Sequence, residues 1–229
     1  MNKFKYYFIL IITSLSLFSC SKDDNSVEVE PLRDFGEQFT ADNITIEEYL
    51  NNYYLDLDFN DPNFADKDVV IKKITDLDTQ SPIMDYLDSD TFPKLLSKNV
   101  ELHGITYKLY YLVLREGIGE KPCNVDGVLA AYSGEYLYKS TVNEVTTLAP
   151  TPFEKVIFPQ SFFNLYEVIT GWSEVFPEFK TGGTPVSNGD GTVTYNNFGA
   201  GVMFLPSGLG YYNQGSGSIP SYTPSISSK

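Results

Sequence analysis

The 229-residue sequence is poor in the residues that most enzymes use for acid–base, nucleophilic or metal chemistry. It contains two cysteines and a single histidine, His103. One histidine disfavours both a Ser-His-Asp hydrolase and a histidine-bound zinc site. Basic residues are also scarce, because 16 Lys and Arg face 30 Asp and Glu and the net charge is −14. Such a charge argues against binding to nucleic acid and against electrostatic attachment to anionic lipid.

The first 20 residues have the pattern of an export signal. Lys3 and Lys5 precede an apolar run over residues 6–12, which is too short to cross a membrane. The Leu-Phe-Ser-Cys sequence that ends at Cys20 is similar to a bacterial lipobox. This likeness implies that residues 1–19 are removed and that Cys20 carries a lipid. An ordinary signal peptide with an incidental cysteine is the alternative.

An acidic and polar segment, residues 20–40, follows and is interpreted as a tether from the lipid anchor. Its first residues, Ser21–Asn25, are similar to the surface-export signals of Bacteroidetes lipoproteins, and a solvated linker has the same composition. We therefore expect a cell-envelope lipoprotein of the outer membrane, on its periplasmic or its surface face.

Residues 41–99 are predicted to form a helical N-terminal extension. Thr45 would cap a helix there, and Glu48 would complete a capping box with it. Apolar residues follow at helical spacing, namely Ile46, Tyr49, Leu50 and Tyr53. The simplest role of such an amphipathic helix is to pack against the rest of the chain.

Two other candidate sites are disfavoured. Asp56–Asp61 places oxygen ligands at alternate positions, but Asp61 stands where an EF-hand loop needs glycine, and Lys67 stands where it needs glutamate. An exposed acidic loop is the better interpretation.

Cys123 has no disulfide partner once Cys20 is lipidated, and a cysteine nucleophile needs a neighbouring histidine. We expect Cys123 to be a buried or half-buried structural cysteine.

A β-rich domain is predicted over residues 100–229. Its expected strands are residues 105–114, 127–132, 135–138 and 201–205, with a break at Ser133–Gly134 and a hairpin that joins 184–186 to 192–195. An apolar face predicts a short helix over Ser173–Phe179, which ends at a glycine pair. With 17 Tyr and 16 Phe, the chain has enough aromatic side chains to build a core and to line a groove.

Five motifs in this domain occur in an order that resembles the FKBP-type peptidyl-prolyl isomerases. They are Gly117–Pro122 (Gly-Ile-Gly-Glu-Lys-Pro), Tyr132–Gly134 (Tyr-Ser-Gly), Val168–Trp172 (Val-Ile-Thr-Gly-Trp), Leu205–Tyr211 (Leu-Pro-Ser-Gly-Leu-Gly-Tyr) and Ile219–Pro220. The resemblance covers residues 100–227, and the glycine-rich segment 199–220 also looks like that of Bacteroidetes lipoprotein members of the family. It implies an α+β fold in which an antiparallel half-barrel sheet wraps around one short helix.

The resemblance further implies rotation about the bond before a proline, without a cofactor. The barrier is about 18–20 kcal/mol, because the twisted amide loses its resonance. A twisted amide is also less polar, so an apolar and water-poor pocket favours it over the planar ground state. The implied catalytic residues are Tyr132, Val168, Ile169, Trp172 and Tyr211, among which the Ile169 N–H and the Tyr211 hydroxyl would hold substrate carbonyls. Further implied pocket residues are Glu144, Phe162, Phe163 and Ile219.

The sequence departs from the family pattern at three places. The second aromatic wall is displaced, and Phe162 or Phe163 is the candidate for it. The family has a Phe-Asp pair after its second strand, for which the nearest counterpart is Asn143–Glu144. The chain also ends at Pro224–Lys229, where family members continue with an apolar strand that supplies a pocket aromatic. We therefore expect the last strand to be truncated, which would leave an unpaired sheet edge.

Three functions stay open from the sequence. The first is a prolyl isomerase that assists the folding of exported proteins, with proline-containing polypeptides as clients. The second is a chaperone or peptide-binding lipoprotein that keeps the groove but has weak turnover. The third is a structural surface lipoprotein, which needs only the lipid anchor and the tether. The pattern does not indicate an oligomeric state.

Overall fold

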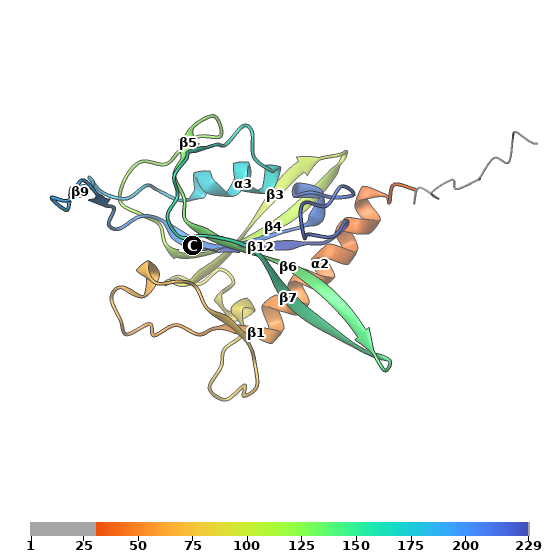
Figure 1. The fold of residues 1–229 in the computed structure, drawn as a ribbon. Coiled ribbons are helices and arrows are strands. Elements are labelled where there is room, and N and C mark those ends of the chain that lie inside the picture. Colours follow the sequence, from red (N-terminus) through yellow and green to blue (C-terminus); the bar gives the residue numbers. More distant parts are fainter. Residues whose placement is uncertain (1–30, 229) are drawn as a thin grey trace, which may run out of the picture. The chain divides into compact units, whose positions relative to one another are not determined.

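Six strands form one antiparallel sheet, in the order β3-β4-β11-β12-β6-β7, in the computed structural model of the chain (Figure 1). Residues 31–228 are described, and from Arg33 onward they belong to one compact unit. The strands are β3 (Lys94–Leu102), β4 (Ile105–Arg115), β6 (Tyr132–Val142), β7 (Val145–Val156), β11 (Ala200–Leu205) and β12 (Ser225–Ser228). The predicted export signal, the lipidated Cys20 and the first part of the tether lie outside the described residues.

Two helices, α2 (Phe35–Asn52) and α3 (Thr170–Val175), accompany the sheet. Figure 1 shows α3 on one face of the sheet and the segment that begins at β1 on the opposite face. Short strands pair as β1 (Tyr53–Leu55) with β2 (Ile71–Lys73), β5 (Gly127–Val128) with β8 (Phe163–Asn164), and β9 (Val186–Ser187) with β10 (Val193–Thr194). Single 3₁₀ turns are η1 (Phe64–Asp66), η2 (Ile83–Tyr86), η3 (Phe176–Glu178) and η4 (Ser207–Leu209). The architecture confirms the predicted α+β class. Within residues 31–228, no helix is long and apolar enough to cross a membrane.

The central strands β4 and β11 are buried on both faces. Successive side chains of a strand point to opposite faces, and the two faces lie in two separate cores. The α2 core contains Ile46, Tyr49 and Leu50 of α2 together with Tyr110, Leu112, Leu114, Val202 and Phe204. The α3 core contains Trp172 and Val175 together with Leu109, Tyr111, Val113, Met203 and Leu205. Burial on both sides explains why residues 105–114 form a nearly continuous apolar run instead of an alternating one.

Helix α2 begins eleven residues before the expected start, because its N-cap is Asp34 and not Thr45. Asp34 caps it, because its carboxylate accepts hydrogen bonds from the amides of Gly36 and Glu37 at 2.9 and 3.0 Å. Thr45 is therefore an interior residue, and its hydroxyl donates to the Ala41 carbonyl. The end of the segment predicted as a tether, residues 35–40, is helical. Polar residues on the buried face of α2 concealed this first part from the hydrophobic pattern.

Residues 41–99 do not form a separate helical extension. Beyond Asn52 the segment holds only two short strands and two 3₁₀ turns, and β3 already begins at Lys94. Ile46, Tyr49 and Leu50 are fully buried in the α2 core. The segment is the second layer of the same domain, because it covers the sheet face that α3 leaves open.

The unpaired sheet edge expected at the last strand is wrong, although β12 is only four residues long. Strand β12 lies inside the sheet, where it pairs with β11 on one side and β6 on the other. Ile226 enters the α2 core, while Ser225 and Ser227 are also buried. A strand of three serines and one isoleucine has little apolar signal of its own. It is held by backbone pairing to two neighbours, which a sequence pattern does not display.

Other boundaries also differ from the sequence pattern. The predicted break at Ser133–Gly134 lies within β6, where the pairing with β7 is irregular after Gly134. The polar stretch after it contains the twelve-residue strand β7. Strand β5 stops at Val128 instead of reaching Tyr132, and the expected helix is divided into α3 and η3. The expected hairpin near Gly189 is confirmed as β9 and β10.

Helix α2 also carries a buried carboxylate, that of Asp42, which is 2% exposed. It accepts hydrogen bonds from the amide and the hydroxyl of Ser207, at 2.7 and 2.6 Å, and from the side-chain amide of Gln38, at 2.7 Å. Burial raises the pKa of Asp42 from 3.8 to about 6, and these bonds and the charge of Arg33 lower it only in part. Desolvation of the charged form is therefore the larger effect.

We expect Ile226→Ala to lower the free energy of unfolding by about 2–4 kcal/mol, because it leaves a cavity in the α2 core. Urea denaturation followed by circular dichroism measures this change. Ile44→Ala is the control, since Ile44 is 58% exposed on α2 and its loss should change stability by less than about 0.5 kcal/mol. Equal effects of the two substitutions would contradict the burial of β12.

We expect the stability difference between the native protein and Asp42→Asn to depend on pH. The pKa of Asp42 is raised in the folded state, so its contribution is fully present below pH 3.8 and is lost as the pH rises through about 6. The native free energy of unfolding minus that of Asp42→Asn should fall by about 2 kcal/mol between pH 4 and pH 7. Tyr107 and Tyr212 also face Asp42, but burial raises the pKa of each and they stay neutral there. Urea denaturation at both pH values measures the difference, and an increase toward pH 7 would contradict it.

Candidate functional site

The motif Val168–Trp172 places Trp172 against the sheet. Ile169 is the N-terminal cap of α3 with extended backbone, and its carbonyl accepts the amides of Trp172 and Ser173 at 3.0 and 3.2 Å. Gly171 allows α3 to approach β11, since a Cβ there would lie 2.6 Å from a methyl group of Leu205. The indole is consequently held in the α3 core with 8% of its surface exposed.

Three aromatic rings surround this indole edge-on. The ring centroids of Tyr132, Phe163 and Phe176 lie 4.9, 5.4 and 5.5 Å from that of Trp172, at interplanar angles of 83°, 87° and 65°. Such T-shaped pairs fix the rings relative to one another. The indole N–H donates to the Ser227 hydroxyl at 3.4 Å. We refer to Tyr132, Phe163, Trp172 and Phe176 as the aromatic cluster.

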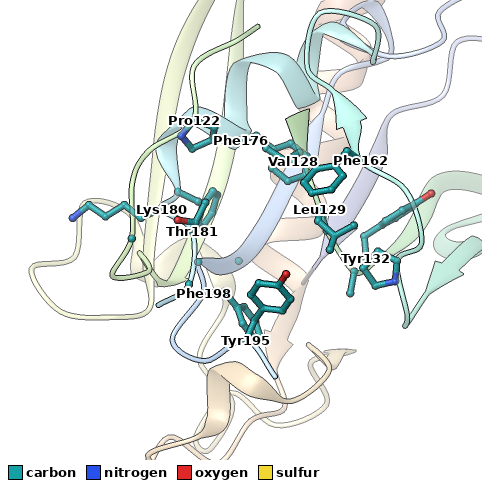
Figure 2. Close-up of a pocket in the computed structure, with 18 of the residues that line it drawn as sticks. Pro122, Val128, Leu129, Tyr132, Phe162, Phe176, Lys180, Thr181, Tyr195 and Phe198 are labelled. Atoms are coloured by element: carbon teal, nitrogen blue, oxygen red, sulfur yellow. The ribbon is translucent and has the colours of Figure 1, made fainter. Parts of the chain in front are cut away.

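The aromatic cluster opens into a cavity of about 1360 Å³, which Tyr132, Trp172 and Phe176 help to line. Figure 2 shows Tyr132, Leu129 and Phe162 on one side of this cavity and Lys180, Thr181 and Phe198 on the other. The walls come from the segments 118–122, 126–132, 157–162, 179–184 and 193–203, with Ser227 and Ser228 of β12. The cavity is therefore assembled from loops that are far apart in the sequence.

The Gly117–Pro122 turn forms one wall through a close backbone contact. Gly117 has φ +92°, a conformation that favours glycine, and a Cβ there would overlap the Lys180 carbonyl. The Gly119 amide donates to the Thr181 carbonyl at 2.8 Å. The glycine spacing thus brings the two segments together at the cavity.

Tyr132 is fixed by Glu154, a residue that the sequence analysis did not select. The Tyr132 hydroxyl donates to the Glu154 carboxylate at 2.6 Å. Burial, this bond, the Glu154 charge and the neighbouring Tyr211 together hold the pKa of Tyr132 well above its usual range. The ring of Phe153 packs on Gly134, where a side chain would overlap it. Phe153–Glu154 is thus an aromatic–carboxylate pair beside the aromatic cluster.

The expected counterpart of that pair, Asn143–Glu144, is wrong. Both residues have positive φ and form the turn between β6 and β7, at the opposite end of β6 from Tyr132. The length of the β6–β7 hairpin is the reason. Residues 143–144 lie at its turn, far from Tyr132, and the chain returns to Tyr132 only at Phe153–Glu154. The signal that was available is the Phe-Glu dipeptide itself, at positions 153–154.

The structure brings most of the other expected residues together. Val168 and Ile169 are half-buried against the α3 core, and Phe163 belongs to the aromatic cluster. Tyr211 is 36% exposed and lies close enough to raise the pKa of Tyr132. Among residues 31–228, the Ile169 N–H has no hydrogen-bond acceptor.

Phe162 and Ile219 fare differently. Phe162 lines the cavity wall with 67% of its surface exposed, so the two adjacent phenylalanines have distinct places. Ile219 is buried, but it does not line the cavity, and its backbone pairs with Ser216. Its place in the substrate pocket stays a prediction.

Cys123 is exposed, contrary to expectation, and its amide N–H donates to the Asp126 carboxylate at 2.7 Å. In the disfavoured calcium segment, Asp61 forms an ion pair with Lys67. No group of three or more His, Cys, Asp or Glu side chains is placed to hold a metal ion in the part of the chain that the structure describes.

No protein-family model and no curated protein sequence matches this chain. Solved structures similar to it include a peptidyl-prolyl cis-trans isomerase from Pseudomonas syringae pv. tomato, with 15% identity and a TM-score of 0.43 over 85% of this chain and 91% of that chain. FkpA from Escherichia coli has 24% identity and a TM-score of 0.36 over 52% of this chain, which spans 44% of FkpA. The N-terminal domain of FKBP42 from Arabidopsis thaliana has 12% identity and a TM-score of 0.30, over 57% and 94%.

We expect Gly134→Ala to displace the Phe153 ring and to lower the free energy of unfolding by about 1–3 kcal/mol. The emission of Trp172, the only tryptophan, should shift because Tyr132 contacts it and Glu154 adjoins Phe153. Gly127→Ala is the matched control, since a Cβ there meets no atom closer than 3.6 Å. Urea denaturation followed by tryptophan fluorescence measures both changes, and a native-like Gly134→Ala variant would contradict the packing.

Proposed function

We propose that the chain is a peptidyl-prolyl cis-trans isomerase whose prolyl site is the aromatic cluster. The observation that supports this most directly is the enclosure of the Trp172 indole by Tyr132, Phe163 and Phe176 at a cavity of about 1360 Å³. Three of the five motifs of the sequence resemblance contribute to the cavity wall, through residues 118–122, Tyr132 and Trp172.

The aromatic cluster suits the physical demand of the reaction. Rotation of an X-Pro bond breaks no covalent bond, so it needs neither a nucleophile nor a cofactor. The twisted amide is less polar than the planar one, and aromatic surface that replaces water stabilises it relative to the ground state. Trp172 forms the floor for the prolyl ring in this proposal, and Tyr132, held by Glu154, forms a wall.

Two polar groups are available to orient the substrate backbone. The Ile169 N–H has no acceptor among the described residues and can donate to a substrate carbonyl. The Tyr211 hydroxyl, exposed near Tyr132, can hold a second carbonyl. Holding both ends of the X-Pro unit would restrict the rotation to the prolyl bond.

We further propose that the clients are exported proteins with proline-containing segments. This part rests on the lipobox at Cys20 and on the preceding export signal, which lie outside the described residues. A lipid anchor at Cys20 would keep the domain at a membrane of the cell envelope, on the periplasmic or the surface face.

A second candidate function is peptide binding with weak turnover. The exposed apolar rim of the cavity favours it, because Ile157, Phe158 and Phe162 are 57%, 79% and 67% exposed. In addition, β12 presents Ser227 to Trp172 where the resemblance implies an aromatic residue. An apolar rim retains unfolded polypeptide, whereas catalysis depends on the enclosed prolyl site.

NMR exchange spectroscopy on a short X-Pro peptide distinguishes the two functions. We expect residues 21–229 to accelerate cis/trans exchange, and Trp172→Ala to lower that acceleration about 10- to 100-fold by removing the floor of the site. Tyr138→Ala is the control, since Tyr138 lies on β6 like Tyr132 but is 50% exposed and does not line the cavity.

The outcome assigns the function. Acceleration that survives Tyr138→Ala but not Trp172→Ala supports the isomerase. A folded protein that binds the peptide without accelerating exchange overturns the isomerase and leaves the peptide-binding lipoprotein. A folded protein that neither binds the peptide nor accelerates its exchange would leave the structural lipoprotein.

A further inference from the structure

The loop that carries Tyr211, residues 206–222, is attached to helix α2 by several contacts. It connects β11 to β12 and contains the single 3₁₀ turn η4. Ser207 begins this turn and donates both its amide and its hydroxyl hydrogen to the Asp42 carboxylate. The Ser207 carbonyl in turn accepts the amides of Gly210 and Tyr212, at 2.9 and 3.0 Å. Asp42 therefore holds Ser207, and the Ser207 carbonyl in turn holds the backbone on either side of Tyr211.

A second set of contacts ties the far part of the loop to the same helix. The Gln38 side-chain amide donates both to Asp42 and to the Tyr222 carbonyl, at 2.7 and 3.1 Å. The Tyr212 hydroxyl donates to the Arg33 carbonyl at 2.5 Å, and its ring stacks on Phe35 with centroids 4.3 Å apart.

Tyr211 is the exposed neighbour of Tyr212. Tyr212 is buried with 8% of its surface exposed, whereas Tyr211 is 36% exposed. The phenol of Tyr211 contributes to the electrostatic interactions that raise the pKa of Tyr132. The loop thus buries one tyrosine against α2 and exposes the next, to which the proposed function assigns the binding of a substrate carbonyl.

We propose that Asp42 is a positioning residue that holds the 206–222 loop, and with it the Tyr211 hydroxyl, beside the aromatic cluster. Its effect on substrate rests on the proposed isomerase function, whereas its effect on the loop does not. Helix α2 is then a part of the site's support, although none of its residues lines the cavity.

The carboxylate is the group that this position requires. Its two oxygens accept three hydrogen bonds, from the Ser207 N–H, the Ser207 O–H and the Gln38 N–H. Asparagine has one acceptor oxygen and an NH₂ group. Asp42→Asn therefore places an NH₂ donor opposite another hydrogen-bond donor, at a residue that is 2% exposed. A buried donor without an acceptor destabilises the native loop, and opening of the loop lets that donor bind water.

Amide hydrogen exchange on residues 21–229, which contain the whole compact unit, tests the loop directly. We expect Asp42→Asn to speed exchange of the Ser207 and Tyr212 amides at least about tenfold, with the amides of β4 and β11 unchanged. Asp34→Asn is the matched control, because it makes the same chemical change on the same helix, and asparagine still caps α2. Unchanged exchange at Ser207 and Tyr212, or equal acceleration across β4 and β11, would overturn the proposal.

A double-mutant cycle with Tyr211→Phe tests the link to the site. We expect Asp42→Asn to weaken binding of an X-Pro peptide about 3- to 10-fold in the native background and to have little effect once Tyr211 is Phe. Equal weakening in both backgrounds would show that Asp42 does not act through Tyr211. Absence of peptide binding by the native chain would count against the proposed function alone, since hydrogen exchange still decides the loop.

Ser207→Ala is the second variant if Asp42→Asn does not fold. It removes only the hydroxyl bond to Asp42 and keeps the bond from the Ser207 amide. We expect a smaller acceleration of exchange at Tyr212 in the same direction, and no change there would overturn the proposal.

Discussion

Burial of the central strands on both faces is the constraint on which this structure depends. Strands β4 and β11 alternate their side chains between two cores, so neither face can be left to water. Helix α3 is only six residues long and covers one face. The other face needs a second layer, which α2 and the segment before β3 supply. This is why the N-terminal part of the domain is integral to it.

The two layers have different consequences for function. The α3 core carries Trp172, and its exposed end becomes the aromatic cluster and the cavity. Helix α2 carries no cavity-lining residue, but it contacts the loop after β11 through Asp42. That loop therefore lies between helix α2 and the proposed substrate site. A carboxylate buried among three donors holds it in one position, at the cost of a raised pKa.

The fold class followed from local patterns, and so did the selection of Trp172 and Tyr132, whose rings are in contact. The apolar run at 105–114 and the run at 201–205 are central strands, and Trp172 packs edge-on against Tyr132. The sequence did not predict the features that have little sequence pattern of their own. Strand β12, with its three serines, is held by two neighbours, and the Phe153–Glu154 pair reaches Tyr132 only through the pairing of β6 with β7.

The sequence alone determined those parts whose signal is contained in a few consecutive residues: glycine turns, apolar strands and the Val-Ile-Thr-Gly-Trp segment. Tertiary structure alone decided which face α2 covers, where the last strand inserts, and which carboxylate meets Tyr132. The physical reason is that these features depend on partners from 22 to 165 residues away. A hydrogen bond to a distant strand or loop leaves no periodic trace in either segment, and it exists only once both are folded.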